Sequence, residues 1–275
     1  MSIRYDNGPS LPIRWTTLLV VTLAIAYSVL ADTLGPGVAD IATVSRRYET
    51  LFTPAPFAFA IWGLIYAGFL GVSIAALLPS QRAMTIYDRL GPPLVLANVF
   101  GATWVAAFQS DLIYVSVLLV LGMLLLAARM FALVSRAAEI GLARFVLTLP
   151  FALFLGWMCV ATLANLGTAL VAMGYAGSGA GARAMTMLAL LVATLAGITI
   201  GVRYRQFVVP AVVAWSAYAI AVADRNADPM VATAAILAAL GCSVAAVVLG
   251  LRRDAFGERS EWPVLRGRRT GLTPR

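Results

Sequence analysis

Aromatic rings and amides inside long apolar runs are the residues best suited to hold a small molecule. Rings of Trp and Tyr stack on flat hydrophobic ligands, and an amide supplies a directed hydrogen bond. An amide in hydrocarbon must find a polar partner, so it faces protein or a cavity. Alternatively, the asparagines only hold helices together and the tryptophans only fill space. The predicted ligand-binding residues are Trp62, Tyr66, Asn98, Trp104, Trp157 and Asn165.

The remaining reactive side chains offer little for catalysis. The chain has no His, and all twenty basic residues are Arg, which removes an imidazole base, a Schiff-base lysine and any His-ligated metal or haem. Cys159 and Cys242 lie singly in apolar runs without metal-binding spacing. No acidic residue lies near the middle of an apolar run, which counts against ion-coupled transport. We therefore predict a binding protein rather than an enzyme, with no required cofactor and no metal.

These residues must be positioned by membrane-spanning helices. Of 275 residues, 61% are apolar and 12% are charged, and the mean hydropathy is +0.91. Soluble domains are about 45–50% apolar and about 25% charged. Eight runs approach the roughly 20 residues that cross a bilayer, which predicts an all-α polytopic transmembrane bundle. The predicted spans are residues 15–34, 56–78, 91–108, 112–134, 145–173, 184–202, 207–223 and 230–251.

The arginines predict how the chain is oriented. Sixteen fall in the N-terminal segment, alternate loops and the C-terminal tail, whereas only Arg46, Arg47, Arg183 and Arg225 fall on the other side. Arginine-rich loops stay in the cytoplasm, so both termini are predicted to be cytoplasmic, in the cell (inner) membrane. The net charge of +8 is thus attributed to topology, not to nucleic acid. A cleaved signal peptide is the alternative for the first span, but its length favours retention.

Four segments follow from this topology. They are a cytoplasmic N-terminus (1–14), a five-helix membrane domain (15–173), a three-helix extension (174–251) and an Arg-rich cytoplasmic tail (252–275).

The same orientation places the candidate residues at one depth. Trp157, Ala161 and Asn165 are spaced four apart and form one stripe on a helix. With the N-terminus inside, Asn165, Trp104 and Trp62 all fall in the outer half of their spans. Residues 38–53 follow the first span on that side, as a lid or as an ordinary interfacial loop. We expect an outer-half, aromatic-lined pocket for a flat hydrophobic ligand.

Several stretches resemble the tryptophan-rich sensory protein / translocator protein (TspO/MBR) family. The second span begins with Pro54 and Pro56 and continues with Phe59, Trp62 and Tyr66, similar to the family's proline-rich entry and its Phe, Trp and Tyr pattern.

The fifth and third spans add to this resemblance. Leu149-Pro150-Phe151 with Trp157 is similar to the family's LPY-x-x-W, and Ala-Thr-Leu-Ala-Asn at 161–165 to its AT-x-LN. Asn98 matches the family's asparagine, and Trp104 follows it by six residues. The resemblance covers residues 15–173, and the last three spans have no counterpart in short members.

The resemblance implies a five-helix bundle with a pocket under the loop after the first helix. It implies a tetrapyrrole-like or sterol-like ligand such as a porphyrin, a sensory or transport role, and homodimers in the bilayer. The alternatives are a secondary transporter of a small neutral or amphipathic solute, a membrane enzyme that modifies a bound tetrapyrrole, and an accessory subunit.

Overall fold

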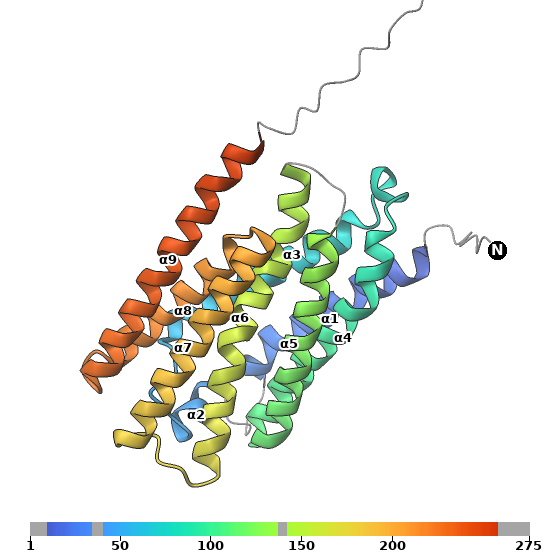
Figure 1. The fold of residues 1–275 in the computed structure, drawn as a ribbon. Coiled ribbons are helices and arrows are strands. Elements are labelled where there is room, and N and C mark those ends of the chain that lie inside the picture. The colour runs from blue at the N-terminus through green and yellow to red at the C-terminus, as the bar shows by residue number, and fades with distance from the viewer. Residues whose placement is uncertain (1–9, 35–40, 137–141, 258–275) are drawn as a thin grey trace, which may run out of the picture.

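A computed structural model describes residues 10–34, 41–136 and 142–257, and this part of the chain is helical, without a β-strand (Figure 1). The predicted all-α polytopic bundle is confirmed. The helices are α1 (Leu11–Leu34), α2 (Ile41–Arg47), η1 (Pro56–Ala60), α3 (Ile61–Ala75), η2 (Pro79–Gln81), α4 (Ile86–Gln109), α5 (Ile113–Ser135), α6 (Leu142–Ala172), α7 (Gly179–Tyr204), α8 (Val208–Asp224) and α9 (Pro229–Gly257).

Each predicted span corresponds to a helix in the described residues. Seven are long and apolar enough to cross a membrane, counting η1 with α3. The eighth, α8, has 17 residues, and at 1.5 Å per residue it is about 26 Å long, slightly under a hydrocarbon core of about 30 Å. Most residues of α8 are buried, because α6, α7 and α9 surround it.

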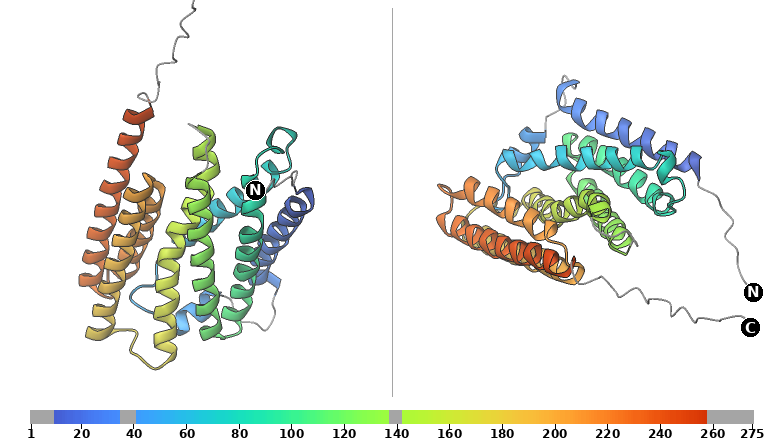
Figure 2. Two further views of the ribbon diagram at one scale, coloured as in Figure 1. Left: turned by 45° about the vertical axis from the view of Figure 1, so that its right-hand side comes forward. Right: turned by 90° about the horizontal axis from the view of Figure 1, so that it is seen from above.

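Five helices form a ring, and three pack on one side of it. Helix α1 packs against α3 and α4, α3 packs against α6, α6 against α5, and α5 against α4, which closes the ring. Helices α7, α8 and α9 pack on one another and reach the ring mainly through α8 on α6. In the right-hand view of Figure 2, these three helices and α1 lie on opposite sides of α6.

Two glycines of the ring permit close helix contacts. A Cβ at Gly68 on α3 would lie 2.6 Å from Pro150 Cβ on α6. A Cβ at Gly156 on α6 would lie 2.8 Å from Val212 Cβ and 3.1 Å from the Val209 carbonyl oxygen on α8. The absence of a side chain at Gly156 therefore lets the three-helix group dock on the ring.

We predict that Gly156→Ala lowers the stability of the detergent-solubilised protein by about 1–3 kcal/mol, because the new methyl group overpacks the contact between α6 and α8. The matched control is Gly63→Ala on α3, where a Cβ meets nothing within 4 Å. There the higher helix propensity of alanine leaves the stability unchanged or raises it. Thermal unfolding followed by circular dichroism measures both, and equal effects would contradict the proposed docking contact.

The start of α4 differs from that of the predicted third span, residues 91–108, which begins at Gly91-Pro92-Pro93. The helix begins five residues earlier, at Ile86, and runs through both prolines. A proline inside a helix forfeits a hydrogen bond, but here the preceding turn is held by other contacts. Gly91 is buried against α1, where a Cβ would lie 2.8 Å from Ile13 Cγ2.

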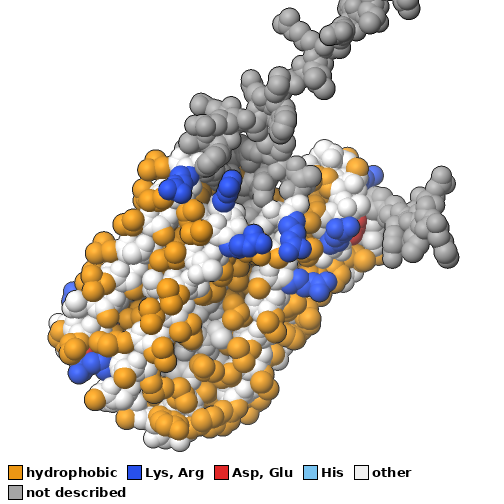
Figure 3. All heavy atoms as spheres, viewed as in Figure 1, with side chains coloured by type: hydrophobic (Ala, Val, Ile, Leu, Met, Phe, Trp, Pro, Cys, Tyr) orange, Lys and Arg blue, Asp and Glu red, His pale blue; other side chains and the backbone are white. Residues whose placement is uncertain are grey.

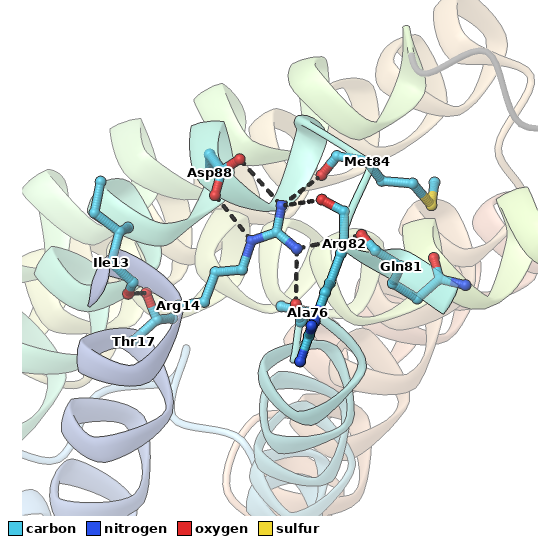
Figure 4. A network of polar contacts seen from close by, with 8 residues as sticks. All are labelled: Ile13, Arg14, Thr17, Ala76, Gln81, Arg82, Met84 and Asp88. Atoms are coloured by element: carbon cyan, nitrogen blue, oxygen red, sulfur yellow. Dashed lines mark hydrogen bonds and ion pairs between the residues drawn. The ribbon is translucent and has the colours of Figure 1, made fainter. Parts of the chain in front are cut away.

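The turn before α4 is held by contacts from Arg14 (Figure 4). Arg14 lies inside α1 and is 1% exposed, although it was predicted to lie in the N-terminal segment. Its Nε donates to Asp88 Oδ1 at 2.9 Å and its Nη2 to Asp88 Oδ2 at 3.1 Å. The guanidinium also donates to four main-chain carbonyl oxygens, those of Ala76, Gln81, Arg82 and Met84. One side chain thus joins α1, the end of α3, the connecting turn and the start of α4.

A second ion pair joins α7 to α9 at the opposite end. Arg183 Nε donates to Asp228 Oδ2 at 2.8 Å, and Asp228 Oδ1 accepts the main-chain N–H groups of Met230 and Val231 at 3.2 Å each. The hydrogen bond from Arg183 holds the pKa of the Asp228 carboxyl below its usual value. Asp228 therefore caps α9 and ties it to α7.

The exposed arginines of the described residues divide unequally between the two ends. Figure 3 shows blue side chains gathered in a band toward one end of the bundle, with an orange apolar surface below it. The end with more of them carries Arg82, Arg89, Arg129, Arg136, Arg203, Arg205 and Arg252. The end with fewer carries Arg46, Arg47 and Arg225, with the half-buried Arg183.

Candidate aromatic ligand pocket

A cavity of about 70 Å³ lies inside the helix ring, toward the end that carries fewer arginines. Its walls come from α3, α4, α5 and α6, and α2 and η1 also reach it. The lining residues are Ile41, Ser45, Thr53, Pro54, Phe59, Trp62, Trp104, Phe108, Val120, Met123, Trp157, Met158, Val160, Ala161, Ala164, Asn165 and Thr168.

Four predicted site residues meet at this cavity, namely Trp62, Trp104, Trp157 and Asn165. Trp62 and Trp157 pack edge to face with ring centroids 6.4 Å apart. Trp104 stacks on Phe108, with centroids 5.1 Å apart and an interplanar angle of 22°. Rings from three helices therefore wall the cavity, and aromatic walls suit a flat apolar ligand.

The other two predicted residues do not line the cavity. Tyr66 lies one turn further along α3 and packs on Trp62 with ring centroids 5.3 Å apart. Asn98 is buried and donates through Nδ2 to the carbonyl oxygen of Leu94, 2.9 Å away in its own helix. Tyr66 therefore packs on Trp62 without lining the cavity. The hydrogen bond of Asn98 stays within α4.

Two indole N–H groups in the wall have no hydrogen-bond partner among the described residues. They belong to Trp104 and Trp157. A buried polar group without a partner costs about 1–3 kcal/mol, so such groups are uncommon. Both residues line the same cavity from different helices, so two unpaired donors lie in its wall.

Asn165 is held in place by a neighbouring helix. Ser116 on α5 donates to Asn165 Oδ1 at 3.1 Å and also contacts the carbonyl oxygen of Ile113 at 2.7 Å. Both Ser116 and Asn165 are buried. This contact fixes the orientation of the amide where it borders the cavity.

A cover segment, residues 41–55, lies over the cavity. Ile41 and Ser45 of α2, together with Thr53 and Pro54, form part of the lining. Val44 is fully buried in an apolar cluster with Phe108 and with residues of α5 and α6. Of the predicted lid, residues 38–40 lie outside the described residues. Of the rest of the predicted lid, Ile41, Ser45 and Thr53 border the cavity, which is where a lid would lie.

Phe108 and the aliphatic and small polar residues of the wall were not identified from the sequence. Phe108 and Thr168 could have been found, since they follow Trp104 and Asn165 by four and three residues and share their helix faces. Val120 and Met123 of α5 could not, because nothing distinguishes them from other apolar residues of a span.

Comparison with known proteins identifies a family for the chain. A family model described as TSPO-like protein matches residues 14–248, which include all of α7 and α8 and most of α9. Searches of curated proteins and of solved structures gave no match. This multi-pass membrane protein therefore belongs to the TSPO-like protein family.

Proposed function

We propose that the protein binds a hydrophobic, flat aromatic or macrocyclic small molecule, of the tetrapyrrole or sterol class, in the aromatic cavity, and that binding serves sensing or transport. The observation that carries the proposal is the pair of buried indole N–H donors, Trp104 and Trp157, that lack partners among the described residues. Family membership supports the same class of ligand. The absence of His and Lys favours binding over catalysis.

Binding of a macrocycle requires the cover segment to move. The cavity of about 70 Å³ is smaller than the roughly 300–1,000 Å³ of drug-sized pockets. The segment's ion pair to the ring, Arg47 to Asp111 at 2.6 Å, is 51% and 39% exposed, so it contributes at most about 1 kcal/mol. Displacement of α2 would break this weak ion pair and uncover Val44, and it would enlarge the cavity.

The direct test is a titration of the full-length, detergent-solubilised protein with protoporphyrin IX, followed by tryptophan fluorescence. We expect saturable quenching and a raised melting temperature, because a ligand at about 100 times its Kd stabilises by about 2.7 kcal/mol. Cholesterol, titrated in parallel, reports the sterol class through the melting temperature. A Trp15→Phe control removes an exposed indole of α1 and should leave the saturable part unchanged. Neither quenching nor a thermal shift with any ligand of these classes would refute the proposal.

We also propose that the termini lie in the cytoplasm of the cell (inner) membrane. This rests on the excess of exposed arginines at the end where α1 begins and α9 ends, since positive loops remain inside.

We predict opposite labelling of two single cysteines by a membrane-impermeant maleimide in intact cells. Ser178→Cys lies in the link between α6 and α7 and should react, whereas Ser80→Cys lies between α3 and α4 and should react only after permeabilisation. Both serines are exposed. The native Cys159 and Cys242 lie within helices and give the background signal. The reverse labelling pattern would show that the protein has the opposite orientation in the membrane.

A further inference from the structure

A second cavity lies outside the ring, between α6 and α7, and it has about 240 Å³. Residues 163–171 of α6 form one wall and residues 182–192 of α7 form the other. The cover segment contributes Thr50, Leu51 and Phe52, and residues 175–177 of the link border the cavity. We call this cavity the α6–α7 groove. In Figure 1 it belongs to the end of the bundle where the yellow link joins the two helices.

The groove has a buried floor and a rim that faces outward. Leu51, Phe52 and Ala182 are at most 8% exposed, which makes them the floor. Leu188 and Val192 of the rim are 61% and 46% exposed. Both helices are membrane spans, so the rim borders the lipid. The groove is thus a recess in the lipid-facing surface.

The length of the groove matches one leaflet. Eight helical steps from Leu163 to Val171 span about 12 Å, and ten steps from Ala182 to Val192 span about 15 Å. Half of a hydrocarbon core of about 30 Å is the same length. Tyr175, at the link end of the groove, is 60% exposed, as suits an aromatic side chain at the membrane–water interface.

We propose that the α6–α7 groove binds an acyl chain of a membrane phospholipid from the leaflet on the link side. The lining is aliphatic and aromatic apart from a few hydroxyl groups. Because an ordered water needs two to four polar partners, the groove is a poor site for water. An empty apolar recess of this volume leaves its lining without contacts. The rim opens to a medium made of acyl chains, so a chain fills the recess without crossing a barrier.

This site differs from the aromatic cavity but shares the cover segment with it. Thr50, Leu51 and Phe52 line the groove, whereas the adjacent Thr53 and Pro54 line the cavity. The segment is also tied to the three-helix group, because the Ala55 main-chain N–H donates to the Ala219 carbonyl oxygen at 3.1 Å. An acyl chain in the groove therefore packs against the same segment that covers the aromatic cavity.

Native mass spectrometry of the full-length protein in detergent, titrated with palmitoyl-oleoyl phosphatidylethanolamine, tests the proposal. We expect one saturable lipid adduct. Ala189→Phe fills the groove from α7, and Met185→Trp blocks it from the more exposed rim, where misfolding is not expected. Each variant should weaken the adduct by about tenfold, which corresponds to about 1.4 kcal/mol. The matched control Leu195→Phe adds a ring to the lipid-facing side of α7 outside the groove and should bind lipid normally.

Two outcomes would overturn the proposal. One is the absence of a saturable adduct, or an adduct that is equal in all variants. The other is a protein dimer, seen in the same spectra, that dissociates in the groove variants, because a second copy of the chain would then occupy the groove. Protoporphyrin quenching in the same variants is a separate readout: if it persists while the lipid adduct is absent, only the acyl-chain site fails.

Discussion

Arg14→Ala is expected to lower the free energy of unfolding by about 3 kcal/mol, the low end for a buried ion pair, because Arg14 is buried but its partner Asp88 is 21% exposed. The substitution leaves Asp88 without its cation and deprives four carbonyl oxygens of a donor. For a chain of this size the loss corresponds to a fall of roughly 10 °C in the melting temperature. Thermal unfolding in mild detergent measures it.

Related variants separate the parts of this network. Arg14→Lys keeps the charge but lacks the planar five-donor fork, so it should lose an intermediate amount. Asp88→Leu combined with Arg14→Met should recover part of the loss, because no charge remains unpaired. Arg82→Ala is the matched control, since its side chain is exposed and its carbonyl oxygen stays available to Arg14. A melting temperature for Arg14→Ala equal to that of Arg82→Ala would contradict the network's structural importance.

The sequence predicted the spans well, because a bilayer requires length and apolarity, and both are properties of single segments. The turn between α4 and α5 lies where the predicted third and fourth spans meet, and the Leu-Pro-Phe entry and the Trp and Asn of α6 lie in one helix. The TspO/MBR resemblance is confirmed by the family match, which extends through the last three helices. Because the match includes α7, α8 and most of α9, these helices belong to the region that the family model covers and are not an unrelated addition.

Rotation of the helices limited what could be predicted about the candidate site. Position along a span gives depth in the membrane, and on that basis Trp62, Trp104 and Asn165 were grouped together; all three line the cavity. Depth does not tell which side of a helix faces inward. Asn98 lies on the same helix as Trp104, but its side chain points about 120° away around the helix axis, since six residues at 100° each leave the two positions that far apart. Its hydrogen bond is accordingly to its own helix.

Interactions between distant segments could not be predicted from the sequence for a different reason. Arg14 was counted as a loop charge. A count of charges along the sequence cannot show that carbonyl oxygens of the α3–α4 turn accept hydrogen bonds from it. The same contacts explain why α4 begins before Gly91, as Asp88 in its first turn belongs to the network. Both features depend on segments more than 60 residues apart.

The double variant Trp104→Phe, Trp157→Phe is expected to weaken binding of protoporphyrin IX by about 30- to 100-fold. A hydrogen bond contributes about 1 kcal/mol on average, and somewhat more when the acceptor is charged, which is about five- to tenfold in affinity for each indole. Phenylalanine keeps an aromatic surface for stacking, so the loss reports mainly on the N–H donors. Titration by fluorescence quenching of the remaining tryptophans measures it.

Trp215→Phe is the matched control for this pair. Trp215 lies on α8 outside the cavity, and its N–H already has a partner in the Ala58 carbonyl oxygen at 3.4 Å. Its replacement should leave the affinity unchanged. Without ligand, the double variant should unfold near the wild-type temperature, because losing two unpaired buried donors opposes the lost ring contacts. Wild-type affinity in the double variant would exclude the indoles as ligand donors, and an equal loss in Trp215→Phe would show that the effect is not local to the cavity.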